Sequence, residues 1–209
     1  VLHDNIKVYP SPVGPVPPIL SFKWRSEDLG MIHDCNIIQM LSGKILVGSK
    51  GDIEHGPDSK DGLYAIDPST GQVIWFFHTP EGGGNGCAVA DLNDDGKLEI
   101  AFTTEGGKLH VLDDDGNSIW SFQADGKILS APTISDINAD GKLEILFEDF
   151  CSQNEGYLYV LSSSGKLLWK FRMNAGVACS ISPAVGDINN DGLFEIIASD
   201  GRGYVYALN

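Results

Sequence analysis

A nine-residue acidic motif occurs three times in the chain, and its spacing constrains the fold more than any other feature. The motif reads Asp-x-Asn-x-Asp-Gly-x-x-Glu and occupies residues 91–99, 136–144 and 187–195. Each copy runs into a short series of apolar, β-type residues, and the copies start 45 and 51 residues apart. A propeller blade of four antiparallel strands takes about 40 to 50 residues. The spacing therefore predicts an all-β fold, a β-propeller with one repeat per blade.

The tryptophans follow the same period. Trp75, Trp120 and Trp169 open similar strands at intervals of 45 and 49 residues, and Trp24 lies 51 residues before Trp75. Turn residues separate the apolar runs between these points, as expected for several short strands in each repeat. A further blade is thus predicted before the first acidic motif. Its corresponding loop, Met40–Lys44, has no carboxylate, so we expect no metal there.

The two ends of the chain are complementary in this pattern. The last repeat has no tryptophan-bearing strand, whereas Ser21–Arg25 forms a spare one. We expect four blades of four antiparallel strands, with Ser21–Arg25 closing the last blade beside Tyr204–Leu208, because closure removes unpaired sheet edges. The alternative is half of an eight-bladed ring, completed by a second copy. Residues 1–18, with five of the ten prolines, are expected to be an extended arm before the propeller domain at 19–209.

The acidic motifs have the donor spacing of a cation site. Positions 1, 3, 5 and 9 offer side-chain oxygens, Gly at position 6 permits a sharp turn, and position 7 offers a backbone carbonyl. Ca²⁺ takes 6 to 8 oxygen ligands in irregular geometry, whereas Mg²⁺ demands a strict octahedron. The alternative for each copy is a solvated turn without metal. The predicted Ca²⁺ ligands are Asp91, Asn93, Asp95, Lys97, Glu99, Asp136, Asn138, Asp140, Lys142, Glu144, Asp187, Asn189, Asp191, Leu193 and Glu195.

Charge and motifs exclude several classes of function. The formal net charge of −15 disfavours nucleic acid and anionic membranes as partners, and no apolar run is long enough to cross a bilayer. The histidines show no zinc-protease spacing, and no Gly-x-Ser-x-Gly elbow occurs. Cys151 and Cys179 lie on connections that could approach bonding distance, with four reduced thiols as the alternative. Catalysis is therefore less expected than binding, and the ligand would be a protein or a carbohydrate.

The candidate ligand site lies on the side of the propeller away from the acidic motifs, because strands alternate in direction. An acidic insertion at 51–61 and a glycine-rich connection at 79–86 would meet there. Long polar loops on a rigid scaffold are common places for recognition, although a solvated hairpin tip is the simpler interpretation. The candidate residues are Asp52, Glu54, His55, Asp58, Glu81 and Asn85.

Two repeat families resemble these residues. The three acidic loops, each followed by an apolar strand, resemble the FG-GAP or VCBS repeats of integrin α-like propellers. Residues 62–75 (GLYAIDPSTGQVIW) and 156–169 (GYLYVLSSSGKLLW) resemble the PQQ-like repeat, LYALDxxTGxxxW. The resemblance implies a propeller with Ca²⁺ between the first two strands of a blade. Quinoprotein dehydrogenases of the PQQ-like type have larger rings and adjacent cysteines, which this chain lacks, so no quinone is expected.

The resulting functional hypothesis is a calcium-binding, ligand-binding or adhesion module that is extracellular, on the cell surface or periplasmic. The alternatives are the propeller of a carbohydrate-active enzyme, lyase-like or accessory, and a fragment of a larger PQQ-like propeller. The expected oligomeric state is a monomer, or a dimer that completes a larger ring.

Overall fold

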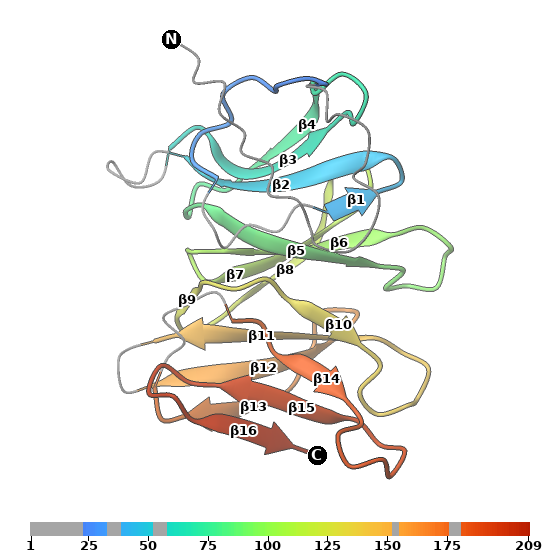
Figure 1. Cartoon of the computed structure of the whole chain (residues 1–209), viewed down its shortest axis with the longest axis vertical. Coiled ribbons are helices and arrows are strands. Elements are labelled where there is room, and N and C mark those ends of the chain that lie inside the picture. Colours follow the sequence, from blue (N-terminus) through green and yellow to red (C-terminus); the bar gives the residue numbers. More distant parts are fainter. Residues whose placement is uncertain (1–22, 33–38, 52–57, 152–154, 176–180) are drawn as a thin grey trace, which may run out of the picture.

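The computed structural model describes residues 23–32, 39–51, 58–151, 155–175 and 181–209. Within these residues the regular elements are β-strands, arranged in four antiparallel sheets that are stacked in chain order (Figure 1). No helix in the described part of the chain has the length and apolar character needed to cross a membrane.

Each sheet is a simple meander of consecutive strands. The first has the order β1 (Gln39–Leu41), β2 (Lys44–Lys50), β3 (Asp61–Ile66), β4 (Val73–His78), and the second has the order β5 (Gly84–Ala90), β6 (Glu99–Thr104), β7 (Lys108–Leu112), β8 (Ser118–Gln123). The third has the order β10 (Thr133–Ser135), β11 (Glu144–Phe150), β12 (Gly156–Ser162), β13 (Leu167–Met173), with the short β9 (Lys127–Ile128) also paired to β11. The fourth has β14 (Ala184–Gly186), β15 (Glu195–Ser199) and β16 (Val205–Leu208).

Burial follows the position of a strand within its sheet. The second and third strands of the complete sheets are buried on both faces, as in β3 and β6, where every residue is buried. The fourth strands β4, β8 and β13 are partly exposed. Continuous apolar runs therefore mark the inner strands, and runs that mix polar and apolar residues mark the outer ones.

The core consists of separate apolar clusters between successive sheets. One lies between the first and second sheets and includes Leu63 and Phe102, and another lies between the second and third sheets and includes Leu109 and Phe147. A third cluster joins the third and fourth sheets around Leu158. Face-to-face packing of twisted sheets in chain order is the arrangement of propeller blades.

The periodic tryptophans fasten each sheet to the next. The indole N–H of Trp75 in β4 donates to the carbonyl of Asp114 in the β7–β8 turn, at 3.1 Å. Its ring covers Gly116, where an added Cβ would lie 2.8 Å from the ring. Trp120 covers Gly165 in the same way in the third sheet. The repeat of tryptophan and turn glycine thus sets the distance between neighbouring sheets.

The expected closure by Ser21–Arg25 beside Tyr204–Leu208 is wrong for the part of that segment the structure describes, residues 23–25. They form no strand, and the last sheet has three strands. Instead, Trp24 donates its indole N–H to the carbonyl of Pro68 at 2.9 Å and covers Gly71 in the first sheet. The first and last sheets lie at opposite ends of the stack (Figure 1), so this docking keeps the segment away from β16. The predicted arm at 1–18 lies outside the described residues.

Candidate functional site

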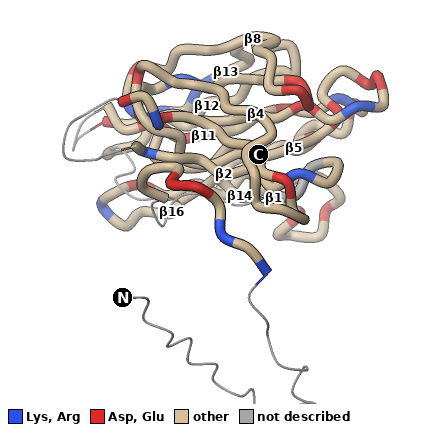
Figure 2. The backbone as a smooth tube through the Cα atoms, turned by 90° about the horizontal axis from the view of Figure 1, so that it is seen from above, with Lys and Arg blue, Asp and Glu red and all other residues tan. Residues whose placement is uncertain are grey.

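The connections between strands emerge on two opposite sides of the stack. Connections from first to second strands carry the three acidic motifs, which lie at the right of Figure 1, and third-to-fourth turns emerge on the same side. Second-to-third and sheet-to-sheet connections emerge on the other side. Figure 2 shows Asp and Glu gathered in loops on both sides. Each side is a candidate site, and their chemistry differs.

The three acidic loops have the same hydrogen bonds. In the first, the N–H of Asp95 donates to Asp91 Oδ1 at 3.1 Å and to Asn93 Oδ1 at 2.9 Å. The N–H of Gly96 donates to Asp91 Oδ2 at 2.8 Å, and the N–H of Lys97 donates to Asp95 Oδ1 at 2.8 Å. The side-chain oxygens of positions 1, 3 and 5 are thus held around one tight turn. The equivalent bonds form in the other loops at Asp136, Asn138, Asp140, Asp187, Asn189 and Asp191.

The backbone of these loops is also the same. Position 4 adopts a left-handed conformation at Asp94, Ala139 and Asn190, with φ of 60°, 57° and 61°. Such a conformation is uncommon for residues other than glycine and requires support from the surrounding structure. The hydrogen bonds to position 1 supply that support, so the loop shape is encoded by the motif itself.

The glutamate at position 9 points inward beneath each loop. Glu99 Oε2 accepts the N–H of Leu92 at 2.8 Å, and Glu144 and Glu195 accept the corresponding N–H groups of Ile137 and Ile188. Burial raises the pKa of Glu99 and of Glu144, and the neighbouring aspartates of their loops raise it further. This carboxylate therefore ties the loop to its strand.

The donor set of the loops fits Ca²⁺ in chemistry. Aspartate and asparagine oxygens are hard ligands, and the carbonyls of Lys97, Lys142 and Leu193 stand at position 7. In the described residues no three Asp, Glu, His or Cys side chains are grouped to share a metal ion. A cation in these loops would therefore rely on the asparagine, the backbone carbonyl and water beside the two aspartates.

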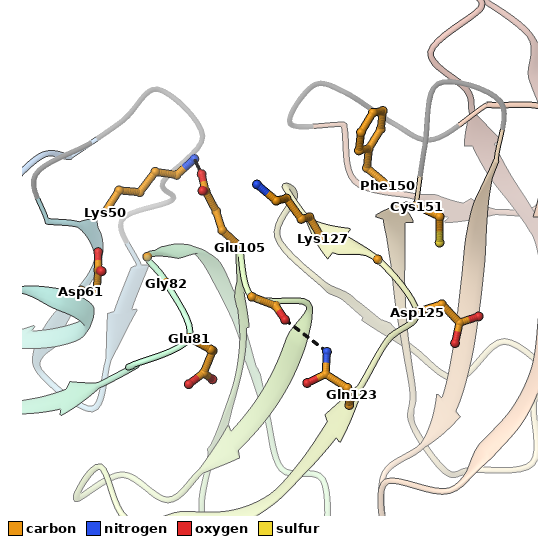
Figure 3. A pocket seen from close by; sticks show the side chains of 13 residues that line it. Lys50, Asp61, Glu81, Gly82, Glu105, Gln123, Asp125, Lys127, Phe150 and Cys151 are labelled. Atoms are coloured by element: carbon orange, nitrogen blue, oxygen red, sulfur yellow. Dashed lines mark hydrogen bonds and ion pairs between the residues drawn. The ribbon is translucent and has the colours of Figure 1, made fainter. Parts of the chain in front are cut away.

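A cleft of about 690 Å³ lies on the opposite side, and we call it the loop-face cleft. It is lined by connections from the first three sheets, which Figure 3 shows converging around one hollow. Lys50 at the end of β2 and Asp61 at the start of β3 line the cleft. The β4–β5 connection adds residues 81–83. The remaining lining residues are Glu105, Gly106, Gln123, Asp125, Gly126, Lys127, Phe150 and Cys151.

Polar ties between connections hold the cleft together. The ammonium group of Lys50 lies 2.7 Å from Glu105 Oε1 and links the first sheet to the second, although the Lys50 side chain is only 7% exposed. Gln123 Nε2 donates to the carbonyls of Gly106 and Gly107, each at 3.1 Å. The Glu105 side chain is 36% exposed, so the ion pair with Lys50 is half-buried and its role is to link the two connections.

Two carboxylates of the cleft have contrasting surroundings. Glu81 Oε1 lies 2.6 Å from His110 Nε2. Burial alone would raise the Glu81 pKa, but the hydrogen bond from His110 and the positive charge of Lys108 bring it below its ordinary value. Burial lowers the pKa of His110, so a neutral imidazole donates to the Glu81 carboxylate. Asp61 is buried with Oδ2 bonded to the N–H of Asp58, and burial raises its pKa.

Asp149 organises the far wall of the cleft. Its Oδ2 accepts the hydroxyl of Tyr159 at 2.9 Å and the N–H of Gly126 at 2.9 Å, and its Oδ1 accepts the N–H of Tyr157 at 2.7 Å. Burial raises its pKa despite these donors. Cys151 Sγ also lies within hydrogen-bonding distance of Asp149, and burial raises the pKa of this free thiol to about 12. The raised pKa keeps the Cys151 thiol protonated at neutral pH.

The predicted ligand residues that the structure describes lie in three different surroundings. Glu81 lines the loop-face cleft, whereas Asp58 lies beside it in a smaller hollow with Asp28 and Lys60. Asn85 is buried and donates to the carbonyl of Ile128, so it has a structural role. Asp52, Glu54 and His55 lie outside the described residues. Sequence reasoning missed Gln123, Asp125 and Lys127, although their glycine-containing connection is equivalent to the one at 79–86.

Comparisons with known proteins identify the repeat. A protein family described as "Outer membrane protein assembly factor BamB" matches residues 59–209. The chain belongs to this family. Its fold is therefore a PQQ-like, BamB-type propeller fold, as the PQQ-like part of the sequence resemblance predicted. The resemblance to FG-GAP or VCBS repeats stays a prediction.

Solved structures share the fold at low identity. The computationally designed Ika4 protein aligns with a TM-score of 0.60 and 13% identity over 90% of this chain and 98% of its own. The C-terminal domain of PilY1 from Pseudomonas aeruginosa gives 0.56 and 19% over 79% and 38%, and BamB from Moraxella catarrhalis gives 0.51 and 15% over 82% and 47%. The chain thus spans less than half of the BamB and PilY1 chains. No curated protein matches it.

Proposed function

We propose that the chain is a non-catalytic, polypeptide-binding segment of a PQQ-like propeller and that it binds its ligand in the loop-face cleft. The observation that carries the proposal is the convergence of connections from three sheets on one hollow of about 690 Å³. Clefts of this size on a rigid scaffold are the usual places for ligand binding. The description of the family as an outer membrane protein assembly factor supports a polypeptide as the ligand and the periplasm as the location.

The lining of the cleft suits a polypeptide. Its glycines let the connections pack closely around the hollow, because an added Cβ at Gly83, Gly106 or Gly126 would meet Lys50, Glu81 or Phe150 within about 2.5 Å. Lys127 is exposed and makes no ion pair with any described residue, while Glu81 and Asp125 provide negative charge. Mixed charge in a cleft of this size favours an extended segment that carries both polar and basic side chains.

Ca²⁺ has a supporting role in this proposal. Binding in the acidic loops on the opposite side would neutralise part of the net charge of −15 and hold the first and second strands of three sheets together. The ligand and the ion would then occupy opposite sides of the scaffold. The chemistry of the loop oxygens supports the ion, and the cleft does not depend on it.

The proposal is tested with tiled synthetic peptides that cover strand segments of a bacterial outer-membrane protein, measured by fluorescence anisotropy. Peptides that bind should lose about tenfold in affinity, or about 1.4 kcal/mol, when Lys127→Glu or Glu81→Gln alters the cleft. Lys166→Glu is the matched control, because Lys166 is exposed in a turn on the acidic-loop side. Equal affinity in all variants would remove the site from the cleft. Binding to a glycan array without any peptide binding would favour the carbohydrate alternative.

A further inference from the structure

Asp61 brings a buried carboxyl oxygen without a hydrogen-bond donor to the wall of the loop-face cleft. The residue lines the cleft on the side of the first sheet, as Figure 3 shows, and it is only 1% exposed. Oδ2 accepts the N–H of Asp58 at 2.7 Å, whereas Oδ1 has no hydrogen-bond partner in the part of the chain that the structure describes. A buried acceptor without a donor destabilises a fold. The protein without a ligand therefore gains no stability from Oδ1.

The repeat does not require a carboxyl at this position. The first three sheets have a leucine in matching register with the preceding strand, and these are Leu63, Leu109 and Leu158. The residue two positions before the leucine is Asp61 in the first sheet, but Gly107 and Gly156 in the second and third. Two sheets thus build the same pair of strands with a glycine. The longer β2–β3 connection accounts for the bond at Oδ2, and it leaves Oδ1 unexplained.

The charges around Asp61 favour a cation beside it. Burial raises the pKa of Asp61 against the hydrogen bond from Asp58, the negative charges of Asp58 and Glu105 add to the rise, and the charge of His78 opposes it. Lys50 lies directly opposite Asp61 in the pairing of β2 with β3, but its ammonium group binds Glu105 Oε1 at 2.7 Å. A further positive charge would offset both the burial of the Asp61 carboxylate and the repulsion from its neighbours.

The single open oxygen of Asp61 selects the kind of cation. Arginine recognises a carboxylate best through two parallel hydrogen bonds, one to each oxygen, whereas lysine carries a compact charge on a flexible stem. Oδ2 already accepts the Asp58 N–H, so Oδ1 is the oxygen that remains for a ligand. An ammonium group fits this geometry better than a guanidinium group.

We propose that Asp61 is the subsite for a lysine side chain of the polypeptide bound in the loop-face cleft. The ammonium group of that lysine donates a hydrogen bond to Asp61 Oδ1. The inference rests on the proposed function, which supplies the bound segment, and it adds the residue that determines specificity. Two other carboxylates of the cleft already have partners in the chain, since Glu81 bonds His110 and Asp125 pairs with Lys170.

Three short peptides test the subsite. Each has blocked ends and a central residue flanked on both sides by serine and glycine, and the central residue is lysine, arginine or norleucine. Norleucine keeps the apolar stem of lysine without the charge. In titrations of the full chain followed by NMR, the lysine peptide should bind about tenfold more tightly than the norleucine peptide. Asp61→Asn should abolish this preference, because it replaces the carboxylate with a neutral amide of the same shape.

Two further variants separate recognition from folding. Asp125→Asn is the matched control, because Asp125 lines the same cleft and pairs with Lys170, and it should change the lysine preference less than about twofold. Asp61→Gly introduces the residue type of the equivalent positions and should also abolish the preference. Asp61→Asn should keep or raise the melting temperature, because the amide oxygen still accepts the Asp58 N–H and the buried charge is removed. A purely structural role would instead lower the melting temperature and leave the ratio between peptides unchanged.

The outcomes distinguish this inference from the proposed function. A lysine peptide that binds no more tightly than the norleucine peptide, or a lysine preference that survives Asp61→Asn, would overturn the subsite. The tiled outer-membrane peptides would still bind in the cleft in that case if the proposed function holds. A preference for arginine over lysine would overturn the single-donor geometry. Lysine binding that depends on Asp61, without binding of any tiled peptide, would support the subsite and count against the proposed function.

Discussion

Trp75 and Gly116 are packed ring against backbone across the boundary between the first and second sheets. An added Cβ at Gly116 would lie 2.8 Å from the Trp75 ring, and φ at this glycine is +81°. The same relationship joins Trp120 to Gly165 and Trp24 to Gly71. A glycine in the third-to-fourth turn is therefore required twice, for its backbone conformation and for the close approach of the ring.

Gly116→Ala is expected to lower the free energy of unfolding by about 2 to 4 kcal/mol, because strain from positive φ and a steric clash act together. Gly203→Ala is the control, since Gly203 has φ of +86° and nothing within 4 Å of an added Cβ. That variant should lose only the free energy of unfolding that a positive φ costs an alanine, about 1 to 2 kcal/mol. Chemical denaturation of both variants measures the difference, and equal losses would contradict a role for the tryptophan contact.

The spacing of the repeats was enough to predict consecutive antiparallel sheets. It was not enough to predict where the segment around Trp24 docks. Strand positions, meander topology and the sidedness of the loops follow from alternating apolar runs and turn residues. The place of Trp24 does not, because its local sequence is that of an outer strand whichever sheet it joins. From its sequence, Trp24 could complete the last sheet or cover the first. Only the separation of these two sheets in the folded structure decides between them.

Glu148 should make stability fall as pH rises. It lies in β11 and is 1% exposed, and burial raises its pKa from 4.5 to about 8. It faces the backbone N–H of Ser199, yet neither carboxylate oxygen has a hydrogen-bond partner of good geometry in the described residues. The folded state therefore holds a proton that the unfolded chain releases above its ordinary pKa, so stability is lost between pH 4.5 and 8.

Glu148→Gln should remove this pH dependence and stabilise the protein at pH 8 by up to about 4 kcal/mol. Denaturation midpoints of wild type and variant, measured across that range, give the result. Glu27→Gln at an exposed position is the control and should leave the wild-type profile unchanged. Parallel profiles for wild type and Glu148→Gln would show that the carboxyl does not titrate there.

The side of the stack on which each set of loops emerges could be predicted from sequence. Alternating strand direction places the acidic loops and the candidate ligand loops on opposite sides, and Glu81 lies in the lining of the cleft. Asn85 was predicted as a ligand residue because its glycine-rich context suggested an exposed loop. In the structure it lies in β5 and is buried. Asp149 was not foreseen as an organising residue, since its partner Tyr159 lies in β12 and its partner Gly126 lies in the connection between the second and third sheets.

Tyr159→Phe should destabilise the wall of the cleft. Its hydroxyl donates to Asp149 Oδ2 at 2.9 Å and accepts the N–H of Asp125 at 3.0 Å, so removing it leaves a buried carboxylate with one donor fewer. We expect a loss of about 1 to 3 kcal/mol. Tyr157→Phe is the control, because its hydroxyl bonds the more exposed Glu155 and should cost less than about 1 kcal/mol. Thermal unfolding separates the two, and equal effects would contradict a special role for Asp149.

Ca²⁺ should raise the melting temperature of the protein, with at least two loops binding an ion. At free Ca²⁺ a hundredfold above Kd, each occupied loop would add about 2.7 kcal/mol to the free energy of unfolding. Mg²⁺ at the same concentration should add less, because it loses water reluctantly and needs strict octahedral geometry. Isothermal titration calorimetry gives the number of sites, and melting with and without chelator gives the stabilisation.

Substitution at position 5 separates ion binding from loop folding. Asp95→Asn, Asp140→Asn and Asp191→Asn together keep an acceptor for the N–H of position 7, which Asp95 Oδ1 bonds at 2.8 Å in the first loop. They remove three negative charges, so the metal-free variant should be at least as stable as wild type, while its response to Ca²⁺ should weaken strongly. Asp115→Asn, at an exposed turn residue on the same side, is the control for charge alone. A melting temperature that ignores both Ca²⁺ and chelator in the wild-type protein would show that these loops are held by their hydrogen bonds without an ion.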